Sequence, residues 1–189
     1  MTAPPSLPDV TIDVVEVSWD DAEGRRLRAA FDAEMAERYG DGPSRDAPPE
    51  AVVQVASARD RIADAFAIRL ETFLTSVLVR IDGTAAAHGA LFDRPDLGAV
   101  EIRKVVVDPA YRGRGLGHRI MSELESRAAA RGAPRVVLDT GPRQPDAVAL
   151  YESRGFARIP PFPPYTSVPR AMCFEKLVGG VGPASATAP

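Results

Sequence analysis

The sequence predicts a single domain of mixed α/β fold, whose central sheet is mostly antiparallel but contains one parallel pair of strands. The chain has 189 residues, and single domains usually run to roughly 100–200 residues. Two strand-like runs flank Asp82-Gly83, a dipeptide that suits a tight antiparallel hairpin. A strand, an amphipathic helix and a second strand follow one another between residues 99 and 139, which predicts a parallel βαβ unit.

The composition excludes several classes of protein. With 45% hydrophobic and 26% charged residues the chain can fill a core, and a net charge of −3 argues against nucleic acid or an anionic membrane as partner. The single cysteine, Cys173, excludes an internal disulfide, a cysteine metal cluster and a CxxC redox pair. Because the sequence shows no signal peptide and no apolar run near the ~20 residues of a membrane span, we expect a cytoplasmic protein.

Both ends of the chain are expected to be flexible, and the domain lies between them. Residues 1–9 hold three prolines, and residues 179–189 have almost nothing to bury. Residues 10–178 would therefore form the folded domain.

The first elements of the domain are a strand and a helix. Residues 10–17 are rich in β-branched side chains and predict the strand. Ser18 and Asp21 have the spacing of a capping box. The helix that follows would end at Gly40, and its apolar stripe consists of Leu27, Phe31 and Met35.

A short helical stretch is expected over residues 61–66, followed by the hairpin of residues 73–81 and 85–92. In the next strand, residues 99–107, a period of two would place Val100, Ile102, Lys104 and Val106 on one face and Glu101, Arg103, Val105 and Val107 on the other.

The βαβ unit continues with a helix that Gly132 terminates, whose apolar stripe consists of Leu116, Ile120, Leu124 and Ala128. Residues 135–139 form its second strand, and residues 144–154 form a last helix capped by Gly155. The final strands are expected near Phe156 and over residues 171–176.

The most informative segment is the glycine-rich turn between the strand at residues 99–107 and the helix that follows. Gly113, Gly115 and Gly117 let the backbone approach a ligand closely, and the first turn of a helix offers unpaired N–H groups to an anion. Arg112 and Arg114 add two permanent positive charges. These features favour a pyrophosphate site, although a turn that only redirects the chain remains an alternative. The spacing is neither that of a Walker A loop nor that of a dinucleotide-binding fold.

Two motifs give this chain a specific resemblance. The turn reads Arg112-Gly113-Arg114-Gly115-Leu116-Gly117, and the last helix carries Ala149-Leu150-Tyr151, with Gly155-Phe156 after it. In this order around a βαβ unit they resemble the Q/R-x-x-G-x-G/A and ALYxxxGF motifs of the GNAT superfamily of acyl-CoA-dependent N-acetyltransferases. The resemblance covers roughly residues 73–177. Gln144 departs from it, because many members have Asn at that position.

The resemblance implies a GNAT-like fold in which the strands at residues 99–107 and 135–139 splay apart. The pantetheine arm of acetyl-CoA would lie between them, with the Val105 amide polarising the thioester carbonyl. No metal is required. The implied cofactor-binding residues are Val105, Val106, Val107, Arg112, Gly113, Arg114, Gly115, Leu116, Gly117 and Gln144.

Two side chains are candidates for the proton transfers of acetyl transfer. Tyr151, by its place in the motif, would protonate the departing thiolate, and its alternative role is packing beside Leu150. Glu101 would deprotonate the acceptor amine, and its alternative role is that of an arginine-paired carboxylate. Other candidate groups are Glu71, Glu50 and His88 as weaker bases, Tyr165 at the border of the acceptor pocket, and His118 as a structural residue.

The function that these features indicate is transfer of an acetyl group from acetyl-CoA to a primary amine of a small molecule, by direct attack. Acetylation of a protein N-terminus or lysine is one alternative, and a non-catalytic acyl-CoA-binding regulatory module is another. Acyl transfer through Cys173 is disfavoured, because no cysteine-histidine-acid arrangement can be read from the sequence. A homodimer is left open.

Overall fold

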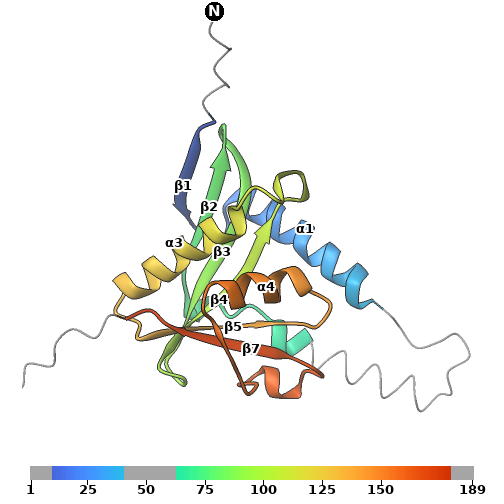
Figure 1. Cartoon of the computed structure of the whole chain (residues 1–189), viewed down its shortest axis with the longest axis vertical. Helices are drawn as coiled ribbons and strands as arrows, with labels where there is room; N and C mark the ends of the chain where they lie inside the picture. Colours follow the sequence, from blue (N-terminus) through green and yellow to red (C-terminus); the bar gives the residue numbers. More distant parts are fainter. Residues whose placement is uncertain (1–9, 41–62, 180–189) are drawn as a thin grey trace, which may run out of the picture.

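The structure is a computed structural model, and it describes residues 10–40 and 63–179 (Figure 1). Its sheet has seven strands in the order β1-β2-β3-β4-β5-β7-β6. Every neighbouring pair is antiparallel except β4 and β5, which are parallel. The strands are β1 (Ile12–Val17), β2 (Phe73–Ile81), β3 (Thr84–Arg94), β4 (Ala99–Val107), β5 (Arg135–Thr140), β6 (Ala157–Ile159) and β7 (Met172–Leu177). The mixed fold class is confirmed.

The helices also follow the predicted order. They are α1 (Ala22–Tyr39), α3 (Leu116–Ala130), α4 (Pro145–Ser153) and the short 3-10 helices Leu70–Thr72, Pro109–Tyr111 and Tyr165–Ser167. Residues 63–66 are helical, while residues 61 and 62 of the predicted stretch lie outside the described residues, as do residues 1–9 and 180–189. Among the helices that the structure describes, none is both long and apolar enough to cross a bilayer.

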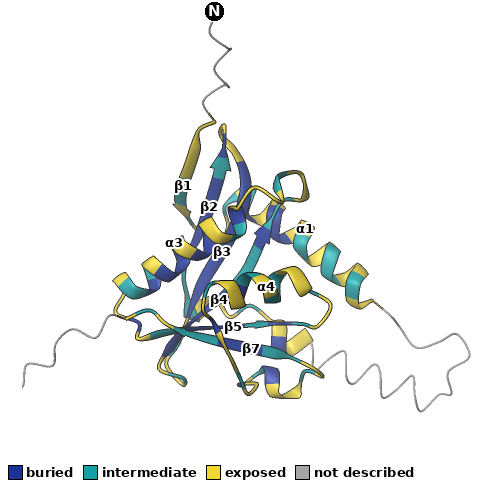
Figure 2. Cartoon of the chain, in the orientation of Figure 1, coloured by how far each residue is buried: buried dark blue, intermediate teal, exposed yellow. Residues whose placement is uncertain are grey.

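The sheet is buried on both faces by different helices. Val77 and Val79 of β2 pack with Ile120 of α3, whereas Leu78, which lies between them in sequence, packs with Leu27 of α1. Because side chains alternate along a strand, α1 and α3 cover opposite faces. Figure 2 shows the consequence, since β2 and β3 are buried along most of their length.

The start of α1 differs from the prediction. Asp21 itself is the N-cap, and its Oδ1 accepts a hydrogen bond from the Gly24 amide at 2.9 Å. Ser18 lies one turn earlier, where its carbonyl oxygen accepts a hydrogen bond from the Asp21 amide. A carboxylate in this position satisfies a free amide of the first turn by itself, so the helix needs no capping box.

β4 and β5 separate shortly after they meet. Their parallel register consists of only two pairs, Val100 with Val136 and Glu101 with Val137, while β5 stays paired with β7 along its whole length. Figure 1 shows β5 and β7 running at a steep angle to β2 and β3. The second half of β4 therefore has a backbone edge that β5 does not use.

The two predicted faces of β4 are wrong beyond Arg103. Lys104 has a φ of 54°, and the register with β3 shifts at this point, which marks a β-bulge. Val100 and Ile102 belong to the core under α3, but Val106 packs in the core under α1. One extra residue in a bulge reverses the alternation of every residue after it.

The bulge also brings Lys104 and Glu101 to one side of the sheet, where the sequence predicted opposite faces. Lys104 pairs with Asp32 of α1, so it points to the α1 face. Glu101 lies between two residues of the α3 face and therefore points to the α1 face as well.

Candidate functional site

A cavity of about 350 Å³ lies where α1, β4, the turn before α3 and α4 come together. Most of the predicted cofactor residues line it, namely Val105, Val106, Val107, Arg112, Gly113, Gly115, Leu116, Gly117 and Gln144. Tyr151 lines the cavity too. The cavity therefore joins the two sequence motifs.

The glycine-rich turn forms one end of this cavity. Gly113 and Gly115 have φ angles of 74° and 76°, and a Cβ on either would meet nothing within 4 Å. The backbone conformation, and not crowding, thus calls for glycine, and the space above the turn is open. The Arg119 amide bonds to the Gly115 carbonyl, so the amides of the preceding first turn of α3 are free. Free amides at a helix N-terminus beside open space fit a pyrophosphate group.

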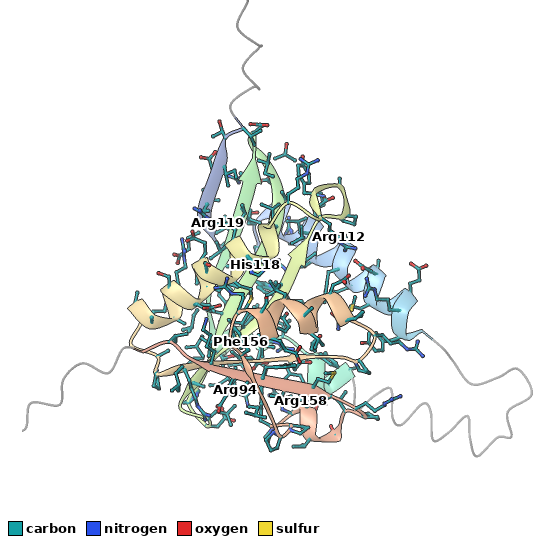
Figure 3. The ribbon with its side chains drawn as sticks, viewed as in Figure 1. Arg94, Arg112, His118, Arg119, Phe156 and Arg158 are labelled. Carbon is teal, nitrogen blue, oxygen red and sulfur yellow. The ribbon has the colours of Figure 1, made fainter. Side chains whose placement is uncertain are left out.

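The two arginines of the turn lie differently. Arg112 lines the cavity, and its Nη2 lies 2.6 Å from Glu34 Oε2 of α1. Figure 3 shows Arg112 at the turn that leads into α3. The Arg112 guanidinium is the main cause that lowers the pKa of Glu34. Arg114 instead stacks on the Tyr111 ring at 5.3 Å and is not among the residues that line the cavity.

The α4 end of the cavity is formed by Gln144 and Tyr151. Gln144 is the N-cap residue of α4, but its side chain makes no capping hydrogen bond, which leaves its amide available to a ligand. Tyr151 is buried, with its ring centroid 5.9 Å from that of Phe156 and 6.1 Å from that of Phe174. Burial, and then the charge of Asp139, raise the pKa of Tyr151, so its hydroxyl keeps its proton at neutral pH.

Glu101 is a buried and fully engaged carboxylate. Its Oε2 accepts a hydrogen bond from Arg94 Nη1 at 2.8 Å, and its Oε1 accepts one from the Tyr165 hydroxyl. Arg103 Nε lies 3.6 Å from Oε1. The arginine-paired alternative thus describes the contacts of Glu101, and Tyr165 is a buried partner of this carboxylate.

Asp139 is the residue that the sequence analysis missed. It lies on β5, two residues beyond the last residue that pairs with β4, so it stands where the two strands have separated. Shielding from water, and then the negative charge of Glu101, raise the pKa of Asp139 to about 7. Asp139 also perturbs the pKa values of Tyr151 and Tyr165, which places all three groups in one electrostatic cluster. The available signal was a charged residue directly after the apolar run of residues 136–138, in the strand that was expected to splay from its neighbour.

The other candidate groups are placed as follows. His88 is fully buried, and burial lowers its pKa to about 4, so it is neutral at pH 7. Glu71 is exposed in the 3-10 helix before β2, Glu50 lies outside the described residues, and His118 lines the cavity. Cys173 is fully buried, and burial raises its pKa to about 11, which leaves little nucleophilic thiolate at neutral pH.

Comparison with known proteins agrees with this geometry. Residues 29–156, more than half of the chain, match the model of the acetyltransferase (GNAT) family. An IAA acetyltransferase from Azospirillum brasilense is 34% identical over 100 residues, which cover 53% of this chain and 65% of that protein. The glucosamine 6-phosphate N-acetyltransferase of Trypanosoma brucei brucei is 32% identical over 112 residues, 59% of this chain and 74% of that protein.

A solved structure shares the fold over nearly its whole length. It is assigned as an acyl-CoA N-acyltransferase from Klebsiella pneumoniae subsp. pneumoniae, and it matches with a TM-score of 0.67 and 26% identity over 88% of this chain and 97% of that chain. This chain spans slightly less than two thirds of the Azospirillum relative. The splayed strands and the glycine-rich turn agree with the family match, and the chain belongs to the GNAT family of acetyltransferases.

Proposed function

We propose that the protein transfers the acetyl group of acetyl-CoA to a primary amine by direct attack, without a covalent enzyme intermediate. The observation that carries this proposal is the layout of the cavity. The glycine-rich turn forms one end of it, and the part of β4 that β5 does not pair with runs along it. The buried Tyr151, whose pKa the charge of Asp139 raises, lies at the other end. Acetyl-CoA, when bound, supplies the thioester.

The turn and β4 would hold the two ends of the co-substrate. The free amides at the start of α3, together with Arg112, would bind the pyrophosphate. Backbone groups of Val105, Val106 and Val107 would bind the pantetheine arm along the edge that β5 leaves free. The Val105 amide would donate a hydrogen bond to the thioester oxygen, where negative charge develops as the amine nitrogen bonds to the acetyl carbon.

Two carboxylates are candidates for the base that takes the proton of the attacking amine. A base is required because an alkyl ammonium has a pKa of about 10.4 and is not nucleophilic. Asp139 fits this role best, because a pKa near 7 lets it both accept a proton at neutral pH and release it afterwards. Glu101, the base expected from the sequence, is already held by two arginines and Tyr165. Its role would be to raise the proton affinity of Asp139.

Tyr151 would complete the reaction as the acid. As the carbon–sulfur bond breaks, the electron pair remains on sulfur, and the hydroxyl of Tyr151 would donate a hydrogen bond or its proton to that thiolate. Burial keeps the hydroxyl protonated before the reaction, and a second proton is available from the Asp139 carboxyl after it has deprotonated the amine.

A small-molecule amine is the acceptor that we favour. The glucosamine 6-phosphate N-acetyltransferase among the relatives is, by its name, an enzyme that acetylates a small molecule. A protein N-terminus or lysine remains the alternative acceptor, and the experiment below distinguishes the two.

The experiment mixes the protein and acetyl-CoA with a panel of amines and follows free thiol together with the mass of the acceptor. The panel holds amino sugars, polyamines, amino acid amides, and peptides with a free N-terminus or a single lysine. The proposal predicts thiol release in step with acetylation of at least one amine. Binding of acetyl-CoA without thiol release for any acceptor would favour the regulatory module, and absence of binding would refute the proposal.

A further inference from the structure

We infer that His88 is a positioning residue that fixes the bulge of β4 at Lys104 and thereby directs the backbone amide of Val105 into the gap between β4 and β5. The catalytic part of this inference rests on the proposed function. The structural part does not, so the two can fail separately.

The bulge needs a restraint because its backbone is unfavourable. Lys104 has a φ of 54°, a left-handed conformation that costs a residue with a Cβ atom free energy. Glycine would adopt it without that cost, yet the chain has lysine here. Contacts from outside β4 must therefore hold Lys104 in place.

His88 supplies one of these contacts through the backbone. Its Nδ1 lies 2.9 Å from the Lys104 carbonyl oxygen, and its Nε2 lies 3.0 Å from Arg28 Nη1. An arginine guanidinium can only donate hydrogen bonds, so Nε2 must be the acceptor. The proton of the neutral ring is consequently on Nδ1, and it is donated to the carbonyl of the bulge.

Arg28 is itself held in place by other contacts, so His88 is restrained by a residue of α1. Its guanidinium lies 3.8 Å from the centroid of the Trp19 ring, and it donates a hydrogen bond to the Trp19 carbonyl oxygen. A Cβ on Gly24 would lie 3.1 Å from Arg28 Nη1 and 3.4 Å from His88 Cδ2, so the glycine makes room for the pair. Arg28 and His88 are only 6% and 0% exposed, so bulk water has little access to the pair.

The side chain of Lys104 is held by the same helix. Its Nζ pairs with Asp32 and lies 5.4 Å from the centroid of the Phe31 ring. The side chain of Lys104 therefore contacts α1 directly, and its backbone carbonyl is linked to α1 through His88 and Arg28.

The restraint matters because of what the bulge leaves unpaired. β3 pairs Ala90 with Arg103 and His88 with Val106, so neither Lys104 nor Val105 has a partner on β3. On the other side, the pairing with β5 has ended at Glu101. Neither residue is therefore in register with a residue of β3 or β5, and Val105 lines the cavity. Only a fixed bulge would aim its amide at a constant point.

The first test concerns the tautomer of His88 and needs no activity. A two-dimensional spectrum of the 15N-labelled imidazoles at pH 7 is simple because the chain has two histidines, and a His118→Gln variant assigns them. The inference predicts a neutral His88 ring with the proton on Nδ1, unchanged from pH 5.5 to pH 8 because its pKa is about 4. A proton on Nε2, or a charged ring at pH 7, would overturn the inference.

The second test compares two amides of matched polarity at position 88. Asn places a donor near the position of Nδ1 and can keep the bond to Lys104, whereas Gln places its amide near Nε2 and can keep only the contact with Arg28. We expect His88→Asn to retain a kcat close to that of the wild type. We expect His88→Gln to lose on the order of 10- to 100-fold in kcat, with little change in the Kd of acetyl-CoA.

Amide hydrogen exchange separates failure of the inference from failure of the proposed function. Faster exchange at Arg103 and Val106, the residues that pair with β3 on either side of the bulge, is expected in His88→Gln compared with His88→Asn, whether or not the protein acetylates an amine. Equal exchange in the two variants would overturn the structural part of the inference. Different exchange with equal kcat would overturn its catalytic part, and so would a loss of kcat that follows the melting temperature in both variants.

Discussion

The two ends of the cavity are built from different parts of the chain. The end proposed to bind the pyrophosphate consists of one short segment, residues 112–118, so the order of residues in the sequence already encodes it. At the other end, Tyr151 lines the cavity, and the proposed reacting groups behind it are side chains of β4, β5 and the 3-10 helix after β6, which only the fold brings together. The difference predicts that the two ends can be disabled separately, binding at one and chemistry at the other.

The largest effect is expected from Gly115→Asp, which adds a Cβ at a φ of 76° and a negative charge where the pyrophosphate would bind. Calorimetry should show no binding of acetyl-CoA. Gly83→Asp is the matched control, because Gly83 has a φ of 77° and an open Cβ position in the β2–β3 turn. If both variants fold and bind acetyl-CoA with wild-type affinity, the turn is not the binding site.

The converse separation is expected from Tyr151→Phe. This variant keeps the packing against Phe156 and Phe174 but removes the hydroxyl proton. The kcat should fall by about 10²- to 10⁴-fold, as is typical when a general acid is lost, while the Kd of acetyl-CoA stays near its wild-type value. Undiminished kcat would reduce Tyr151 to a packing residue.

A smaller contrast is expected between the two arginines of the turn. Arg112 lines the cavity, and Arg114 stacks on Tyr111 outside it. Titration with acetyl-CoA should show about tenfold weaker binding or more for Arg112→Ala, because a charged hydrogen bond is lost. Arg114→Ala should change the Kd by about threefold or less, since a screened exposed charge contributes little. The reverse order would place the pyrophosphate elsewhere on the turn.

The smallest effect concerns stability. Because the pKa of Asp139 is raised to about 7 in the folded protein, the folded state holds a proton there that the unfolded state releases near its ordinary pKa of about 3.9. The contribution of this group to the free energy of unfolding is therefore full below that value and is lost as the pH rises through about 7. Asp139→Asn should raise the melting temperature at pH 8 relative to the wild type. An unchanged or lower melting temperature at pH 8 would show that the site tolerates the charge.

The contrast between the two ends also explains what the sequence could predict. The glycines and Arg112 lie within a few residues of one another, so their spacing alone predicted the turn that borders the cavity. The helix stripe of α3 was predictable for the same reason, because a period along the chain determines which residues are buried.

Residues that depend on distant contacts were not predictable in this way. The bulge at Lys104 contains no glycine that would indicate it in the sequence. Its contacts come from His88 and from Asp32, which lies 72 residues away in sequence. The pKa of Asp139 depends on burial and on Glu101, a residue of another strand. Glu101 was expected as a base from its place on β4, but its partners Arg94 and Tyr165 come from a neighbouring strand and a late 3-10 helix.

The central claim about the proposed chemistry is that Asp139 is the base, and one measurement tests this claim most directly. The pH profile of kcat/KM is recorded for the wild type and for Glu101→Gln, which keeps the shape of the side chain but removes its charge. If Asp139 is the base, the kcat/KM of the wild type rises with pH through an apparent pKa near 7. The kcat/KM of Glu101→Gln should show the same rise, but with a lower apparent pKa, because the negative charge of Glu101 no longer raises the pKa of Asp139. Loss of this rise in Glu101→Gln, with recovery only toward the pKa of the amine, would contradict the account and make Glu101 the base.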